Sequence, residues 1–70
     1  MATIKVIEVI SSSPHGFQQA VEAALQESAK TIRDIVGIQV VGWTCKVENG
    51  RICDYRTDCK VAFKVEGDRV

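Results

Sequence analysis

Residues 38–65 read IQVVGWTCKVENGRICDYRTDCKVAFKV, two apolar-rich runs on either side of the dipeptide Asn49-Gly50. Asn-Gly supplies the two positive φ angles of a type I′ turn, the commonest tight connection between antiparallel strands. The stretch therefore predicts a β-hairpin with strands over 38–47 and 51–65. Its turn sets Glu48 opposite Arg51 and thereby fixes the pairing along both strands.

Pairing counted outward from this turn places Trp43, the single tryptophan of the chain, directly opposite Arg56. Because side chains alternate between the two faces of a strand, the register divides the hairpin into two sets. The set predicted to face a helix is Ile38, Val40, Thr44, Tyr55, Thr57, Cys59, Val61 and Phe63. The set predicted to face away is Gln39, Val41, Trp43, Cys45, Val47, Ile52, Asp54, Arg56, Asp58 and Lys60. A bulge in either strand would exchange these faces.

A strand and an amphipathic helix precede the hairpin. Residues 4–10 (IKVIEVI) are rich in β-branched side chains and predict a strand. Ser13 is a favourable N-cap and Pro14 suits the first helical position, so we expect a helix from there to about Asp34. Its apolar stripe recurs at three- and four-residue steps and consists of Phe17, Val21, Ala24, Leu25, Ser28 and Ile32.

The predicted fold is therefore α+β, with the order β-α-β-β in a single domain over residues 1–70. The helix returns the chain, so the first two strands run the same way and the third fits antiparallel between them. This gives a three-stranded antiparallel sheet in the order 2-3-1 wrapped around one helix, which covers only one face. A chain this short buries only about 60% of its unfolded surface. We therefore expect oligomerisation through the uncovered apolar side chains.

Composition excludes several classes of function. Nine basic residues balance nine acidic ones, so the sequence lacks the basic excess typical of nucleic-acid binding. We expect no signal peptide and no membrane span, and a cytoplasmic location. Three cysteines without C-x-x-C spacing predict reduced, small apolar residues rather than disulfides or a zinc site. The sequence contains no constellation of acid, base and nucleophile, so we do not predict an enzyme.

Several segments resemble the dodecin family and together span almost the whole chain. Each is weakly specific alone, but their order and spacing over so short a chain are strongly specific. From the opening strand to the end of the hairpin they are 6–10 (VIEVI), 12–14 (SSP), 30–35 (KTIRDI), 37–40 (GIQV), 48–52 (ENGRI), 54–56 (DYR) and 60–63 (KVAF).

The resemblance implies a β-α-β-β subunit assembled as a hollow homododecamer. It also implies that the assembly stores or sequesters a flavin (FMN, riboflavin or FAD) without turning it over, as stacked pairs between tryptophans of neighbouring subunits. In flavin-binding members that tryptophan stands two residues after the glycine that Gly37 matches, and here the position holds Gln39. The glutamine that binds the flavin ring corresponds to Arg56.

Trp43, Arg56 and Gln39 are the predicted cofactor-binding residues, and we assign no catalytic residue and no metal ligand. Trp43 either stacks on a small aromatic ligand or packs a subunit interface in cation–π contact with Arg56. Arg56 either holds an anionic group or pairs with Asp54 or Asp58. The leading hypothesis is a flavin-storing oligomer. The alternative, motivated by Gln39 and Arg56 in place of both usual contacts, is a shell that binds no flavin and is structural or ion-binding. Asp54 and Asp58 share a face and could meet copies of themselves around a pore, which would suit calcium.

Overall fold

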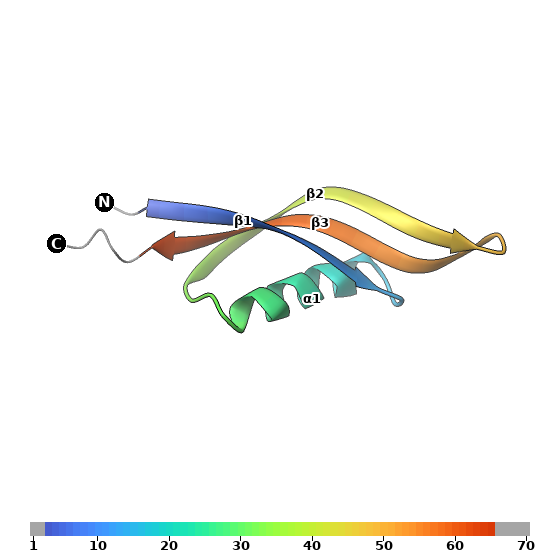
Figure 1. Cartoon of the computed structure of the whole chain (residues 1–70), viewed down its shortest axis with the longest axis horizontal. Coiled ribbons are helices and arrows are strands. Elements are labelled where there is room, and N and C mark those ends of the chain that lie inside the picture. The colour runs from blue at the N-terminus through green and yellow to red at the C-terminus, as the bar shows by residue number, and fades with distance from the viewer. Residues whose placement is uncertain (1–2, 66–70) are drawn as a thin grey trace.

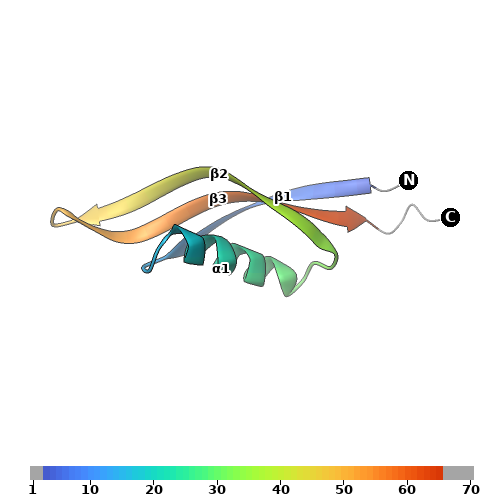
Figure 2. The same ribbon diagram turned by 180° about the vertical axis from the view of Figure 1, so that it is seen from behind.

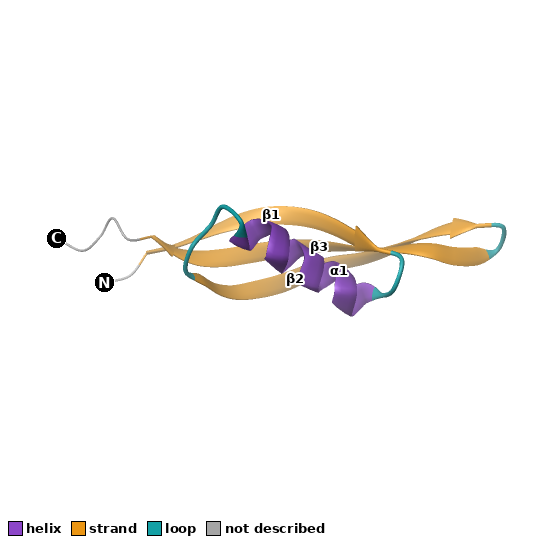
Figure 3. Cartoon of the chain, turned by 90° about the horizontal axis from the view of Figure 1, so that it is seen from below, coloured by secondary structure: helices purple, strands orange, loops and turns teal. Residues whose placement is uncertain are grey.

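The structure is a computed structural model that describes residues 3–65. In chain order its elements are β1 (Thr3–Ser13), α1 (Phe17–Ala29), β2 (Ile35–Glu48) and β3 (Arg51–Val65). The strands form one antiparallel sheet in the order β1-β3-β2, and α1 lies obliquely across one face of it (Figures 1 and 3). The predicted α+β fold and strand order are confirmed. Within residues 3–65 no helix is long and apolar enough to cross a membrane.

Beyond the end of β1, the strands β2 and β3 continue as a two-stranded arm (Figures 1 and 2). Ser13 closes β1 opposite Tyr55, so the first residues of β3 pair with β2 alone. Asn49 and Gly50 have φ angles of 53° and 74° at the tip, as the type I′ turn requires. The arm gives the subunit an elongated shape of 57 × 19 × 13 Å.

Bulges interrupt the pairing of β2 with β3 and change the predicted register. Next to the turn the pairing is as predicted, but Cys53 is an extra residue that displaces the following pairs by one. A second extra residue, Val41, restores the predicted register from Val40 to Gly37, and a third, Val36, displaces it again at the start of β2. Between these bulges Trp43 pairs with Thr57, so its predicted pairing with Arg56 is wrong. A bulge sets two residues against one, which turn counting alone cannot anticipate.

The bulges also move Trp43 to the other side of the sheet. Residues directly opposed on antiparallel strands share a face, and Thr57 is fully buried on the face that α1 covers. Trp43 therefore lies on this helix face, whereas Thr44, predicted to face the helix, lies opposite Arg56 on the other side. We call that other side the open face. It carries Val6, Glu8, Ile10, Gln39, Thr44, Asp54, Arg56, Asp58, Lys60 and Ala62.

Small side chains bring α1 close to the sheet. Ala20, Ala24 and Ser28, at four-residue spacing, are the buried residues of the helix. Opposite them on β3, the side chains of Thr57, Cys59 and Val61 are fully buried, as predicted. Leu25, predicted to face the sheet, is 40% exposed, and the buried Ala20 was absent from the predicted stripe. Because the helix lies close to the sheet, its small side chains are the ones that face β3. A prediction from hydrophobicity alone places Leu25 there instead.

The start of α1 differs from the prediction because β1 is longer than expected. Ser13 is still part of β1, and its hydroxyl accepts a hydrogen bond of 3.0 Å from the backbone N–H of His15. This bond closes the turn between strand and helix, as serine hydroxyls do in tight turns. The N-cap is Gly16, and no side chain caps the helix.

The end of α1 comes five residues before the predicted limit, at Ala29 rather than Asp34. Asp34 has a φ angle of 60°, in the left-handed region, and so cannot continue a helix. Its carbonyl accepts a hydrogen bond of 3.0 Å from the backbone N–H of Lys64, which fixes the loop to the end of β3. β2 then begins at Ile35, three residues earlier than expected.

Candidate functional site

The three residues predicted to bind a ligand do not come together within the subunit. Gln39 and Arg56 both lie on the open face, as predicted, but Trp43 lies on the helix face. Gln39 pairs with Lys60, four residues from Arg56 along β3, or about 13 Å at about 3.4 Å per residue. The prediction that Trp43 shares their face is wrong because of the bulges described above. A ligand on the open face of one subunit therefore cannot contact all three residues.

Trp43 belongs to an aromatic cluster that joins α1 to the base of the arm. The ring of Phe17, the first residue of α1, lies 4.7 Å from Trp43 and 5.1 Å from Tyr55, with interplanar angles of 81° and 78°. These edge-to-face contacts stabilise aromatic pairs beyond the apolar area that they bury. Trp43 is nevertheless 51% exposed, so about half of its surface is free for a further contact.

Arg56 forms an ion pair on the open face. Its Nε lies 3.7 Å from Oδ2 of Asp54, one of the two partners that the sequence predicts. The cation–π contact of Arg56 with Trp43 is absent because the two side chains leave the sheet on opposite faces. The Arg56 side chain is 52% exposed, so the pair contributes little to stability.

Gln39 lines a groove of 480 Å³ on the open face. The remaining lining residues are Val6, Gly37, Ile38, Lys60 and Ala62. Val6 and Ala62 are cross-strand partners and form an apolar floor, while Gln39 and Lys60, also partners, add an amide and an ammonium group. Such a groove can accommodate a flat apolar ring that also accepts hydrogen bonds.

Two carboxyl groups meet next to this groove. Glu8 pairs with Lys60 and therefore lies diagonally across from Asp58. A hydrogen bond with Asp58 and the negative charge of Asp58 raise the pKa of Glu8 above its ordinary value, and Lys60 offsets only part of this effect. Repulsion between the two negative charges is relieved when Glu8 takes up a proton or when a cation lies between the two groups.

The environment of Asp58 also favours a cation or a hydrogen-bond donor beside its carboxyl group. Its Oδ1 atom is shielded from solvent and has no hydrogen-bond partner among residues 3–65. A buried acceptor without a donor is costly. Within the same residues no group of three or more His, Cys, Asp or Glu side chains could hold a metal. The Glu8–Asp58 pair thus supplies only part of the coordination shell of a calcium ion, which takes about six to eight oxygen ligands.

Sequence reasoning missed Glu8 as a member of this pair. The predicted placement of Asp54 and Asp58 on the face away from the helix is confirmed. Glu8, however, reaches Asp58 through the pairing of β1 with β3, and no short turn connects these strands. The apolar pattern of β1 does not mark the face of Glu8, because Ile7 and Val9 lie on the helix face while Val6 and Ile10 lie on the open face.

The cysteines follow the prediction in part. All three are free thiols, and Cys59 is a buried core residue, as expected. Cys45 and Cys53 are exposed on the arm, where the bulged Cys53 places its Sγ 3.5 Å from the carbonyl oxygen of Lys46. The expectation of a small apolar core role therefore holds for Cys59 alone.

Comparison with known proteins agrees with this architecture. The sequence model of the Dodecin family matches residues 3–66. The calcium dodecin of Mycobacterium tuberculosis is 31% identical over 65 residues, which cover 93% of this chain and 92% of that protein. Its crystal structure, described as that of a calcium-chelating antigen with a novel calcium-binding site, has a TM-score of 0.79 at 30% identity over 97% of both chains. Dodecin from Streptomyces coelicolor has a TM-score of 0.91 at 28% identity over 96% of both chains. The chain therefore belongs to the dodecin family.

Proposed function

We propose that this chain assembles with copies of itself into a closed shell that binds a divalent cation, and that it is a binding protein rather than an enzyme. The Glu8–Asp58 carboxyl pair on the open face carries this proposal. Glu8 and Asp58 lie diagonally across β1 and β3, and a cation between two neighbouring carboxylates offsets their mutual repulsion once both are ionised. Calcium is the leading candidate because it prefers carboxylate oxygens and tolerates irregular coordination.

Self-assembly is supported by the apolar side chains that a single subunit leaves in solvent. The most exposed of them are Ile10 (71%), Val47 (60%), Val36 (56%), Val6 (54%) and Ile52 (52%). A chain of this size is only marginally stable by itself, and association would bury these side chains. We propose the family's homododecamer as the assembled form. A neighbouring copy would also supply the oxygen ligands that one subunit lacks.

One known relative supports a cation over a flavin. The calcium dodecin of Mycobacterium tuberculosis, about 30% identical to this chain in sequence and in its crystal structure, is named for calcium. The family resemblance places Gln39 and Arg56 at the positions of the two flavin contacts of flavin-binding members. Trp43 lies on the other face of the sheet. The flavin-storage hypothesis therefore has less support than calcium binding.

Calcium titration of the purified oligomer by isothermal calorimetry tests the proposal. Glu8→Gln and Asp58→Asn should each weaken binding by at least about tenfold, because each removes a charged oxygen ligand. Glu22→Gln is the matched control, since Glu22 is an exposed carboxylate on α1 that accepts a hydrogen bond of 3.3 Å from Gln18. Calcium binding that persists unchanged in both pair variants, or no binding at millimolar calcium, would refute the site.

Flavin remains the second candidate because of the groove beside Gln39, whose apolar floor and amide suit an isoalloxazine ring. Titration of riboflavin, followed by quenching of its own fluorescence, tests this alternative. Gln39→Trp should strengthen binding by adding a stacking surface, whereas Trp43→Ala should leave it unchanged. No quenching at micromolar riboflavin, in the wild type and in Gln39→Trp, would exclude it.

We propose a cytoplasmic location. Cys45 and Cys53 are exposed free thiols, which persist in reducing compartments. Cell fractionation with detection by antibody checks this assignment, and recovery outside the cytoplasmic fraction would contradict it.

A further inference from the structure

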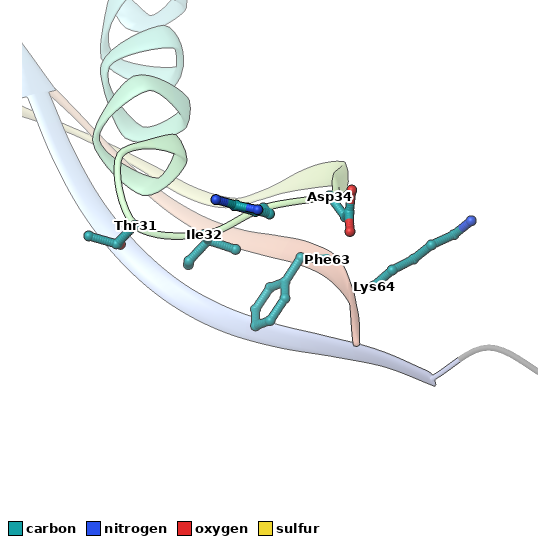
Figure 4. Close-up of a pocket in the computed structure, with 6 residues that line it drawn as sticks. Thr31, Ile32, Asp34, Phe63 and Lys64 are labelled. Carbon is teal, nitrogen blue, oxygen red and sulfur yellow. The ribbon is translucent and has the colours of Figure 1, made fainter. Parts of the chain in front are cut away.

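A second cavity lies where the loop from α1 to β2 meets the end of β3, remote from the arm (Figures 1 and 4). Its volume is 350 Å³, within the range of about 300–1,000 Å³ typical of small-molecule sites. The lining residues are Thr31, Ile32, Arg33, Asp34, Phe63 and Lys64. We call it the loop cavity. It is separate from the groove beside Gln39 and from the Glu8–Asp58 pair.

Positive charge exceeds negative charge around the loop cavity. Arg33 and Lys64 line it, and Lys5 flanks it as the cross-strand partner of Phe63 on the same face. Among the described residues of the lining, Asp34 is the one carboxylate, and it is outnumbered by the two cations Arg33 and Lys64. The ion pairs found among residues 3–65 use other cations, namely Lys30, Lys46 and Arg56. The lining thus has an excess of one positive charge, and Lys5 nearby adds to it; none of these cations is in an ion pair among residues 3–65.

The backbone of the loop between α1 and β2 adds two N–H groups that donate no hydrogen bond to a backbone carbonyl among residues 3–65. The N–H groups of residues 30–32 bond back to the carbonyls of Glu27 and Ser28. The next two, of Arg33 and Asp34, donate to no backbone carbonyl among residues 3–65. Asp34 is left-handed, and consecutive N–H groups around a left-handed residue form the concave sites that bind anions. The bond from Lys64 N–H to the Asp34 carbonyl holds this conformation in place.

An apolar surface lies beside these donors. Figure 4 shows the ring of Phe63 next to Ile32, with Asp34 and Lys64 beyond it on the side away from Thr31. Phe63 and Ile32 are both partly exposed, so a ligand can contact them without any rearrangement of the core. The loop cavity therefore combines an anion-binding end with a flat hydrophobic side.

We propose that the loop cavity binds a phosphate monoester whose organic part is flat and apolar. The phosphate would contact the guanidinium of Arg33, whose planar fork fits two phosphate oxygens, and the free N–H groups of the loop. The organic part would lie against Phe63 and Ile32. A monoester carries about two negative charges near pH 7, which the guanidinium of Arg33 and the ammonium group of Lys64 can balance.

Phenyl phosphate, titrated into the native oligomer by calorimetry, is the probe that tests this proposal. It should bind more tightly than either inorganic phosphate or phenol, because only the ester uses both parts of the cavity. Arg33→Gln should weaken binding by at least about tenfold, because the variant loses a hydrogen bond between two charged groups. Lys30→Gln is the matched control and should change affinity by less than about twofold, because Lys30 is paired with Glu27 outside the cavity.

Asp34→Asn is expected to strengthen binding, a result that misfolding of the variant cannot produce. Asparagine also tolerates the left-handed conformation, so the loop is kept while a repelling charge is removed. Affinity for phenyl phosphate should rise by about threefold or more. Unchanged binding in Arg33→Gln, or equal affinities for phenyl phosphate and inorganic phosphate, would overturn the proposal. Glu8→Gln should leave phenyl phosphate binding intact, so failure of the calcium site and failure of the loop cavity are separable.

Discussion

Trp43 lies directly opposite Thr57 across β2 and β3, and this pairing places the single tryptophan of the chain on the face that α1 covers. There it contacts Phe17 at 4.7 Å and links the start of the helix to the arm. Gln39 and Arg56, the other two residues of the predicted ligand site, lie on the opposite face of the sheet. The tryptophan is therefore a structural residue of the subunit whose free half remains available to a partner.

Trp43→Ala should lower the free energy of unfolding by about 1.5–3 kcal/mol, less than for a fully buried tryptophan because the side chain is 51% exposed. Urea unfolding of the oligomer, followed by circular dichroism, measures the change. Val47→Ala is the control, since Val47 is 60% exposed on the arm and should shift the midpoint little. Equal midpoints for wild type and Trp43→Ala would contradict the structural role.

Thr57→Val should leave stability unchanged or raise it by about 1 kcal/mol. The Thr57 hydroxyl is fully buried and has no hydrogen-bond partner among residues 3–65, so replacing it with a methyl group removes an uncompensated polar atom. Thr44→Val, at an exposed position, should change stability by less than about 0.5 kcal/mol. A clear loss of stability in Thr57→Val would mean that the hydroxyl is satisfied by a bound water.

Stability should fall as the pH rises above the ordinary glutamate value of 4.5 and through the raised pKa of Glu8. A raised pKa means that the folded state binds the proton more tightly than the unfolded state, so folding is favoured at low pH and this contribution is lost on deprotonation. Unfolding free energies measured across this range, with and without calcium, check the prediction.

Calcium should restore the lost stability at neutral pH and bind more weakly as the pH falls, because protons compete for the same oxygens. In Glu8→Gln the amide donates to Asp58 without a titrating proton, so the pH dependence should flatten. A pH profile identical in wild type and Glu8→Gln would show that the pair is not the titrating group.

Ile52→Lys should shift the assembly towards smaller species, because a charge at a 52% exposed apolar position on the arm opposes burial against a neighbour. Native mass spectrometry gives the distribution of oligomers directly. Gln26→Lys, on the exposed side of α1, adds the same charge and should leave the distribution unchanged. Intact oligomers of Ile52→Lys at wild-type concentration would exclude the arm as a contact.

The sequence predicts the elements and their order because local signals define them. Asn49-Gly50 determines the hairpin, and the full span of β3 follows from it. The register fails between the bulges because a bulge is set by packing, and nothing marks Cys53 as an extra residue. The sequence does mark the second bulge, at Val41. Two adjacent apolar residues, Val40 and Val41, break the alternation there, and Gly42 follows them. A glycine inside a strand often accompanies a bulge.

The candidate sites were less predictable, because each joins segments that no local pattern connects. Glu8 and Asp58 meet through the pairing of the first and last strands, which depends on the whole sheet. The loop cavity depends on the early end of α1 at Ala29, which frees the residues up to Asp34 from the helix. The expected longer helix would have occupied the N–H groups that the cavity now leaves free.

The bulges also have a consequence for how such chains diverge. One extra backbone residue decides whether a side chain of β2 faces the helix or the outside of the sheet. Gain or loss of a single residue in the hairpin would therefore transfer a tryptophan across the sheet while the β-α-β-β architecture stays intact. In this fold, ligand preference can change through insertion and deletion as readily as through substitution of the contact residues.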